Sequence, residues 1–282
     1  MNNLESYVKK QIRLEQVQQR KYIKQQQQAI VDKMCPKEFS MPLSLQFELT
    51  GRCNCNCLHC YNRSGDLPKD LMTPLRWKEL ATEIVEFGGI FECIVSGGEP
   101  LMLKDELIKI MDILHEDGTS FMLITNALLM TKSKIKELKK YRFRWIQISI
   151  DGSNADIHDN LRQIRGSWDK AVNAALMVAD VGIPLAIANT VTPATLDDLQ
   201  AMVQLAYSCG ASSLITGEVF PSGRGAQNEA LLLTNEQRAY LWKSIEEQQK
   251  LYAGRMIIRR SMSNKIQLES ASELPMTRCL ST

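Results

Sequence analysis

The sequence predicts an α/β fold: a parallel sheet that forms a partial, open barrel of six βα units, resembling part of a TIM barrel. From residue 45 onward, short runs rich in β-branched and aromatic residues alternate with helical patterns, which is the signature of repeated βα units. Several of these runs are continuously apolar, as strands buried on both faces are. Six units instead of eight predict a sheet that stays open.

Helix boundary signals separate the expected strands. These strands cover residues 45–50, 91–96, 120–125, 145–150, 185–190 and 213–219. Thr73-Pro74 places a proline in the first turn of the first helix, and Gly88 and Gly118 end the first and second helices. Residues 167–181 repeat the helical pattern, so the alternation continues along the chain.

Three parts are expected along the chain. Residues 1–40 form a basic helical arm, residues 41–232 the partial barrel, and residues 233–282 a short C-terminal extension. The extension contains a helix over 234–252 and a further strand over 255–259.

Composition excludes several classes of protein. The 282 residues are 44% hydrophobic and 23% charged, which is the ordinary globular range and allows a large core. No run approaches the roughly 18 apolar residues of a membrane span, and the N-terminus lacks the layout of a secretory signal. We therefore expect a cytoplasmic protein without a membrane partner. The net charge of +2 is too small to indicate a nucleic-acid partner.

The N-terminal arm holds most of the positive charge. The segment before residue 35 carries about +4 by its lysines, arginines and carboxylates. A charge run of this kind is usually a solvated helix face, which is the favoured interpretation. The alternative is a surface that steers an acidic partner, such as an acidic leader peptide.

The cysteines point to metal chemistry. Four of the eight crowd into one stretch, at Cys53, Cys55, Cys57 and Cys60. Thiolates are the usual protein ligands of iron–sulfur clusters, and Cys53-x3-Cys57-x2-Cys60 supplies three for four irons. The open iron is free to chelate an amine and a carboxylate. A structural zinc site using all four cysteines is the alternative, although zinc modules usually separate two pairs by a longer loop.

The other distinctive residues follow the next strands. Gly97-Gly98-Glu99-Pro100 follows the second expected strand, Asn126 the third and Asp151 the fourth. Right-handed crossovers place the carboxyl ends of all strands on one rim. The chemistry is expected on that rim, beside the cysteine loop.

These motifs together resemble the radical S-adenosylmethionine superfamily, in particular the branch with SPASM or twitch C-terminal extensions. The resemblance covers about residues 43–225 and rests on several motifs in order. They are Glu48-Leu49-Thr50, the cysteine loop through Tyr61, Gly97-Gly98-Glu99-Pro100, Thr125-Asn126, Ser149-Ile150-Asp151-Gly152, His158-Asp159-x-x-Arg162 and Pro221-x-Gly223-Arg224.

The resemblance implies two cofactors, a [4Fe–4S] cluster and S-adenosylmethionine. Cys53, Cys57 and Cys60 would be the catalytic cluster ligands. The cluster would receive an electron from a flavodoxin- or ferredoxin-type donor and cleave S-adenosylmethionine to methionine and a 5′-deoxyadenosyl radical. That radical would take a hydrogen atom from the substrate, while the protein positions the cofactors and excludes water.

Cofactor contacts are implied in the same way. Gly97 and Gly98 would let the backbone approach the methionine part of S-adenosylmethionine, and Glu99 would accept a hydrogen bond from its amino group. Ser149 and Arg162 would bind its carboxylate, since a planar guanidinium can hold an oxyanion bidentately.

Three further contacts lie nearby. Asp151 is expected near the ribose, and the backbone of Tyr61 near the adenine. Asn126 is also assigned to the cofactor, with one departure: the family commonly has glycine after Thr125-Asn126, where this chain has Ala127. A positive φ is therefore not expected at Ala127, and an altered turn is.

The resembled branch includes enzymes that mature peptides and proteins, so a peptide or protein is the first expected substrate. The second hypothesis keeps the radical chemistry with a small molecule, such as a haem or amino-acid intermediate. The third is a zinc-bound interaction module without enzymatic activity.

The remaining cysteines bear on a second cluster. Cys35, Cys93, Cys209 and Cys279 are scattered, and a scattered cysteine is by default a small core hydrophobe. Relatives in the branch supply more cysteines beyond this point, whereas this chain ends three residues after Cys279. We therefore expect no complete auxiliary-cluster domain: residues 233–282 are either a truncated start of the SPASM or twitch region or part of a natural minimal core.

Overall fold

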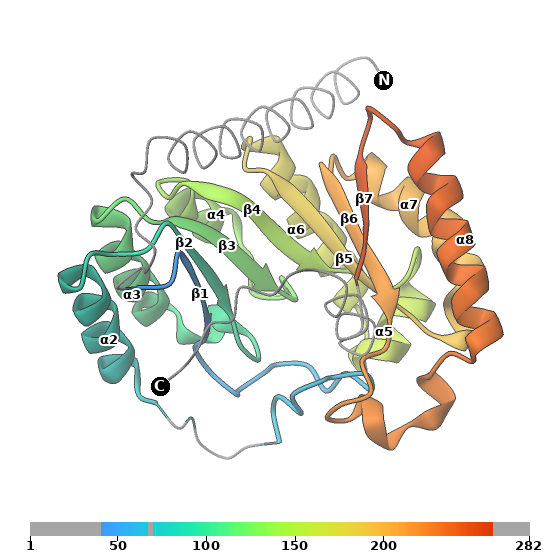
Figure 1. Cartoon of the computed structure of the whole chain (residues 1–282), viewed down its shortest axis with the longest axis horizontal. Coiled ribbons are helices and arrows are strands. Elements are labelled where there is room, and N and C mark those ends of the chain that lie inside the picture. Colours follow the sequence, from blue (N-terminus) through green and yellow to red (C-terminus); the bar gives the residue numbers. More distant parts are fainter. Residues whose placement is uncertain (1–40, 67–69, 71, 262–282) are drawn as a thin grey trace, which may run out of the picture.

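A single parallel sheet organises the protein. The computed structural model describes residues 41–66, 70 and 72–261. Its strands are β1 (Ser44–Glu48), β2 (Glu92–Ser96), β3 (Ser120–Thr125), β4 (Phe143–Ser149), β5 (Leu185–Val191), β6 (Ser213–Glu218) and β7 (Ile257–Arg260). Each strand pairs in parallel with the next, and within the described residues β1 and β7 are the two edges (Figure 1). The α/β class and the open sheet are confirmed.

Helices alternate with these strands. They are α2 (Pro74–Glu86), α3 (Asp105–Glu116), α4 (Lys132–Leu138), α5 (Ala155–Arg162), α6 (Ser167–Asp180), α7 (Leu199–Ser208) and α8 (Asn235–Leu251). Short 3₁₀ turns lie at Pro100–Leu103, Pro193–Asp198, Gly225–Gln227 and Glu229–Leu231. As the sequence predicted, Pro74 opens α2, and the Thr73 side chain accepts a hydrogen bond from the Arg76 amide at 3.2 Å. No helix in the described ranges is long and apolar enough to cross a membrane.

The sheet has one strand more than the sequence predicted. β7 pairs in parallel with β6, with Ser213 opposite Ile257 and Thr216 opposite Arg260. The strand expected over 255–259 therefore extends the sheet itself, after the α8 crossover. Its four residues end in two arginines, so the run lacks the apolar pattern that identified the other strands. The expected arm, residues 1–40, and the tail beyond Ser261 lie outside the described residues.

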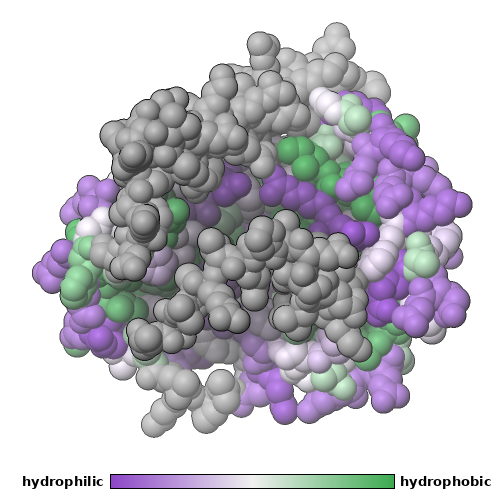
Figure 2. All heavy atoms as spheres, in the orientation of Figure 1, coloured by the Kyte–Doolittle hydropathy of each residue, from purple (hydrophilic) through white to green (hydrophobic). Residues whose placement is uncertain are grey.

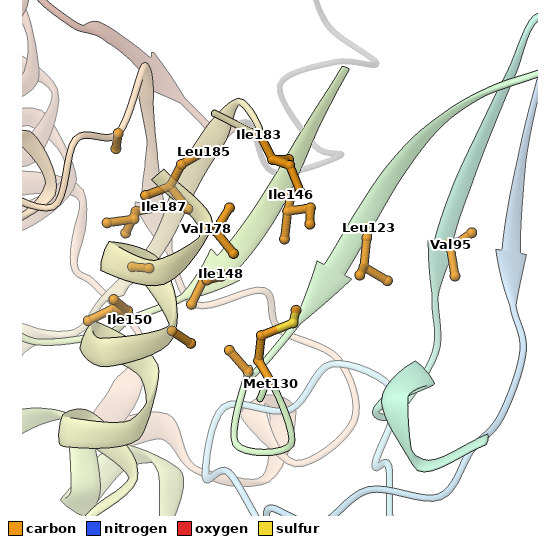
Figure 3. Close-up of a cluster of buried hydrophobic side chains, with 14 of the residues drawn as sticks. Val95, Leu123, Met130, Ile146, Ile148, Ile150, Val178, Ile183, Leu185 and Ile187 are labelled. Carbon is orange, nitrogen blue, oxygen red and sulfur yellow. The ribbon is translucent and has the colours of Figure 1, made fainter. Parts of the chain in front are cut away.

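The main core lies between one face of the sheet and the helices (Figure 3). Its central side chains are Val95, Leu123, Ile146, Ile148, Leu185 and Ile187 from β2–β5, with Val178 of α6 and the flanking Met130, Ile150 and Ile183. Each buried aliphatic side chain of this kind contributes about 1.5–3 kcal/mol. Cys93 and Cys209 are buried in the same core, as predicted for scattered cysteines.

A second, smaller apolar cluster lies apart from the main core. It consists of Ile94, Met122, Trp145, Ala186 and Ile215, one from each of β2–β6. The guanidinium groups of Arg144 and Arg259 lie over the Trp145 ring at 4.8 and 5.3 Å from its centroid. Apolar side chains on both faces explain why the strands read as continuous apolar runs. Hydrophilic side chains crowd instead on the outer surface of α8 (Figure 2).

The turn after β3 differs from the prediction. Ala127 has a φ of 62°, so the positive φ that was not expected without glycine is present. The turn is held by side chains: Thr125 Oγ1 accepts from the Ala127 amide at 2.9 Å, and Asn126 Oδ1 accepts from the Leu128 amide at 3.0 Å. These bonds offset a left-handed conformation that costs about 1–2 kcal/mol for a residue with a Cβ.

Replacing Ala127 with glycine tests this strain. Ala127→Gly relieves this strain, which offsets the usual losses from backbone entropy and the missing methyl group, so the free energy of unfolding should change by about 1 kcal/mol or less. Ala174→Gly is the control, because Ala174 is equally buried within α6. Its expected loss is about 2 kcal/mol, from helix propensity and one lost methyl contact. Urea unfolding of both variants measures the difference, and equal losses would contradict the strain.

Candidate functional site

The predicted functional residues gather at the carboxyl edge of the sheet. The cysteine loop follows β1, Gly97 to Pro100 follow β2, Asn126 follows β3, and Asp151 follows β4. Figure 1 shows the arrowheads of the strands, the light-blue loop after β1, α5 and the orange segment after β6 near this edge. The rim expected from the sequence is therefore confirmed.

Backbone contacts close the cysteine loop into a ring. The Gly65 amide donates to the Gly51 carbonyl at 2.8 Å, which joins the two ends of the loop. On the opposite side, the Leu58 amide donates to the carbonyl of Leu161 in α5 at 2.9 Å. The loop is therefore attached both to its own stem and to the helix after β4.

Gly97 and Gly98 press against the start of this loop. The Gly98 amide donates to the Thr50 carbonyl at 2.6 Å. A Cβ on Gly97 would lie 2.6 Å from that oxygen, and one on Gly98 would lie 2.2 Å from the Arg52 carbonyl oxygen. These distances are below van der Waals contact, so no larger residue fits. The loop itself thus requires both glycines, and the expected approach to the methionine of the cofactor stays a prediction.

Asp70 fixes the same loop start from outside. Its carboxylate accepts from Thr50 Oγ1 at 2.8 Å, from the Gly51 amide at 2.8 Å and from Arg52 Nε at 3.1 Å. Sequence reasoning missed Asp70, since a lone aspartate between Lys69 and Leu71 carries no local signal.

Three of the four thiols interact directly. The Cys55 thiol hydrogen-bonds to the sulfur atoms of Cys53 and Cys57, which raises the pKa of Cys55 strongly. The same hydrogen bonding lowers the pKa of Cys53. It also lowers the pKa of Cys57 to about 5; Arg162 contributes to this shift, whereas burial opposes it. Cys53 and Cys57 are therefore disposed to be thiolates, whereas Cys55 keeps its proton.

The fourth thiol points elsewhere. Cys60 Sγ donates to Asn62 Oδ1 at 3.1 Å and accepts from the Ser64 amide at 3.3 Å. Among the described residues, no three cysteine, histidine, aspartate or glutamate side chains converge in the arrangement of a metal site. The donor chemistry nevertheless fits an iron–sulfur cluster, because four thiols share one short loop and two of them are acidified.

Asn126 and Glu99 connect the loop to the strand ends. Asn126 Nδ2 donates to Asn54 Oδ1 at 2.8 Å and to Cys55 Sγ at 3.3 Å. The buried Glu99 carboxylate accepts from Thr125 Oγ1 at 2.7 Å and from the Asn126 amide at 2.8 Å. Burial raises the pKa of Glu99 to about 6, although these bonds oppose the shift. Glu99 thus holds the ends of β2 and β3 together.

Arg162 and Asp151 form a buried ion pair. Arg162 Nε lies 2.7 Å from Asp151 Oδ2, and both side chains are almost inaccessible to solvent. Burial alone would raise the pKa of Asp151, but Arg162, together with two histidines, lowers it to about 2. Arg162 Nη1 also contacts Cys57 Sγ at 3.6 Å. A fixed positive charge therefore lies against one of the acidified thiols.

Two histidines complete this buried group. His59 Nε2 lies 3.4 Å from Asp151 Oδ2, and the Asp151 amide donates to His158 Nδ1 at 3.0 Å. Burial lowers the pKa of both histidines, that of His158 to about 4, so both are neutral near pH 7. Both neutral imidazoles therefore lie directly against Asp151.

The last two predicted residues have different surroundings. Tyr61 is 45% exposed, and its hydroxyl donates to Glu48 Oε1 at 2.6 Å; burial and this bond raise the pKa of the hydroxyl. Ser149 is the partly buried last residue of β4. Both lie at the carboxyl edge, and their contacts with a cofactor stay predictions.

The sequence missed the element that orients Arg162. Residues Ala155–Arg162 form α5, begun by the side chain of Asn154, which accepts from the Ile157 amide at 3.1 Å. His158 and Arg162 are four residues apart and so share one helix face. The Asn154 cap was the available signal.

Comparisons with known proteins agree with this geometry. Residues 47–206 match the Radical SAM superfamily. The chain is 29% identical over 71% of its length to the AdoMet-dependent heme synthase of Methanosarcina barkeri, covering 57% of that protein. It is 30% identical over 67% of its length to the subtilosin biosynthesis protein AlbA of Bacillus subtilis, covering 42%. It is 35% identical over 66% of its length to the mycofactocin maturase MftC of Mycolicibacterium smegmatis, covering 46%. The chain spans about half the length of these relatives.

Solved structures share the fold. Streptococcus suis SuiB bound to S-adenosylmethionine aligns with a TM-score of 0.66 and 15% identity, over 79% of this chain and 51% of that one. Native anSMEcpe with bound AdoMet aligns with a TM-score of 0.64 and 20% identity, over 77% and 64%.

The open parallel sheet and the cysteine loop after its first strand define a class of α/β proteins with a thiol-rich loop at the carboxyl edge of the strands. Within that class, this chain belongs to the radical SAM superfamily, whose enzymes use a [4Fe–4S] cluster and S-adenosylmethionine. The family predicted from the motifs is confirmed, and peptide maturases are among the relatives.

The buried ion pair gives a stability prediction. Asp151→Asn leaves the buried Arg162 charge without its counterion, so the free energy of unfolding should fall by about 3–5 kcal/mol. Glu83→Gln is the matched control, because Glu83 pairs with Arg76 at 2.6 Å on the exposed face of α2. That variant should unfold like the wild type. Equal unfolding midpoints for Asp151→Asn and wild type would show that the pair does not stabilise the fold.

Proposed function

We propose that this protein reductively cleaves S-adenosylmethionine and uses the resulting radical to take a hydrogen atom from a substrate. The observation that supports this most is the closed cysteine loop, in which two thiols with lowered pKa lie beside Arg162 and Asn126. Family membership supports the same chemistry. All six cysteines among the described residues are free, which suits the cytoplasmic location that we also propose.

Cys53, Cys57 and Cys60 would hold the cluster. Metal ligation requires thiolates, and the lowered pKa values of Cys53 and Cys57 favour that state. Cys60 lies on the same ring and would contribute the third sulfur. Cys55 would remain a protonated neighbour, because its hydrogen bonding with the other two sulfur atoms raises its pKa strongly. The cluster, when bound, supplies the electron that breaks the sulfonium bond to give methionine and a 5′-deoxyadenosyl radical.

The protein would bind and orient S-adenosylmethionine around this loop. Arg162 has five N–H donors, of which Nε binds Asp151 and Nη1 contacts Cys57. Its remaining donors, with Ser149, would hold the cofactor carboxylate. Asp151 would act by holding Arg162 in place, and its contact with the ribose remains part of the proposal.

Two further groups would face the cofactor. Glu99 retains lone pairs beyond its hydrogen bonds to Thr125, Asn126 and Leu101. The Glu99 carboxylate can therefore accept a hydrogen bond from the amino group of S-adenosylmethionine. The backbone of Tyr61 would border the adenine, at the point where the loop turns back toward its stem.

A peptide or protein is the substrate that we propose, with a flavodoxin- or ferredoxin-type electron donor. The relatives include the subtilosin biosynthesis protein, PqqA peptide cyclases and a mycofactocin maturase. A small-molecule substrate is the second candidate, because two other relatives are named AdoMet-dependent heme synthase and Fe-coproporphyrin III synthase.

Cysteine variants test the radical chemistry. After anaerobic reconstitution with iron and sulfide, the wild type should be brown and should release 5′-deoxyadenosine with dithionite and S-adenosylmethionine. Cys53→Ala, Cys57→Ala and Cys60→Ala should each reduce this product at least about 100-fold, since losing a ligand removes the reactive cluster. Cys55→Ala should retain it. A colourless wild type with bound zinc would favour the zinc-bound, non-enzymatic interaction module and would contradict the proposed radical chemistry.

The substrate class has a separate test. Peptides encoded beside the gene should change mass in the presence of the reconstituted protein, and 5′-deoxyadenosine should rise above the rate without peptide. Haem precursors, tested in parallel, should leave that rate unchanged. Turnover with a haem precursor and with no peptide would select the small-molecule alternative.

A further inference from the structure

Arg224 makes an unusual set of contacts with the cysteine loop. It belongs to the segment after β6, in the motif Pro221-x-Gly223-Arg224. Its Nε donates to the Cys57 carbonyl at 2.8 Å, and Nη1 and Nη2 donate to the Ser64 carbonyl at 3.1 and 3.0 Å. Nη1 also pairs with Asp66 at 2.7 Å. One guanidinium therefore joins two distant points of the ring.

The backbone of the same segment reinforces this contact. The Arg224 amide donates to the Cys60 carbonyl at 2.8 Å. A Cβ on the preceding Gly223 would lie 2.4 Å from the carbonyl oxygens of both Cys60 and Tyr61, and Gly223 has a φ of 57°. Only glycine brings the segment this close, so the position of Arg224 against the loop is closely determined.

We propose that Arg224 is a positioning residue that sets the spacing between Cys57 and Cys60 by holding the Cys57 and Ser64 carbonyl groups with its side chain and the Cys60 carbonyl group with its amide. The inference rests on the proposed function, because it concerns the loop that would bind the cluster. The motif Pro221-x-Gly223-Arg224 contributed to the family resemblance, but the resemblance assigned no role to Arg224.

Arg224 positions the loop through its hydrogen bonds to carbonyl groups and not through its ion pair with Asp66. Asp66 is one-third exposed and also pairs with Arg63 at 3.0 Å, and exposed pairs of this kind contribute little. The Arg224 side chain, by contrast, is only 14% exposed. Hydrogen bonds from a buried cation to carbonyl groups are among the stronger ones, and losing the donor leaves the acceptors unpaired.

The shape of the guanidinium is essential to this positioning role. Its planar fork directs Nε to one carbonyl group and both Nη atoms to another. A lysine carries the same charge as a single point on a flexible stem, so it cannot reach both positions at once. Lysine is therefore expected not to replace Arg224.

The first measurement uses the full chain before iron is added. In Arg224→Gln and Arg224→Lys, hydrogen exchange of peptides covering residues 57–66 should be about tenfold faster or more, because loop opening no longer breaks charged hydrogen bonds. Arg63→Gln is the control, since it removes the other partner of Asp66 and leaves the carbonyl contacts in place. Its exchange should equal that of the wild type.

The second measurement uses the reconstituted protein. Both Arg224 variants should lose iron to a chelator about tenfold faster than the wild type. Arg224→Gln should also lower the reduction potential of the cluster, because it removes a nearby cation. Arg63→Gln should match the wild type in both. Unchanged exchange and iron loss in Arg224→Gln, or full rescue by Arg224→Lys, would overturn the positioning role. A wild type that binds no cluster would instead refute the proposed function.

Discussion

The structure depends on how closely neighbouring segments approach the loop after β1. Gly97 and Gly98 lie against its start and Gly223 against its end, each at a distance that a Cβ would not permit. Since these glycines come from the ends of β2 and β6, the ring is held from two sides of the sheet. The sulfur atoms consequently lie on a backbone with little freedom, which is what a site for a preformed inorganic cluster requires.

The charged groups around the cysteine loop are paired. A loop with several thiolates accumulates negative charge, and burial makes such charge expensive unless cations or donors lie near it. Arg162 contacts Cys57, and Asn126 contacts Cys55. Asp151 in turn holds Arg162, with His59 and His158 neutral around the pair. Each charge next to the cysteines therefore has a partner of its own, supplied by α5 and the end of β4.

Local patterns in the sequence predicted most of the fold and the location of the site. Apolar runs and boundary glycines identified six strands, and parallel topology placed the motifs on one rim. The seventh strand was expected near residues 255–259, but its place in the sheet was not, because Arg259 and Arg260 break the apolar pattern. The φ of Ala127 was wrongly predicted because its turn depends on the Thr125 and Asn126 side chains. Asp70 and Arg224 contact residues that lie 18 or more positions away in the sequence, and no single-sequence pattern encodes such pairings.

The sheet is open at its two edge strands, but loops at its carboxyl edge contact one another. β1 and β7 are separate edges among the described strands, so hydrogen bonds of the sheet do not join the first and last strands. At the carboxyl edge, however, the segment after β6 binds the loop after β1 through Gly223 and Arg224. This contact connects the segment after β6 to the loop after β1, although the described edge strands themselves do not pair. Hydrogen bonds from Arg224 to loop carbonyl groups thus hold the cysteine loop at the rim of a sheet whose first and last described strands do not pair.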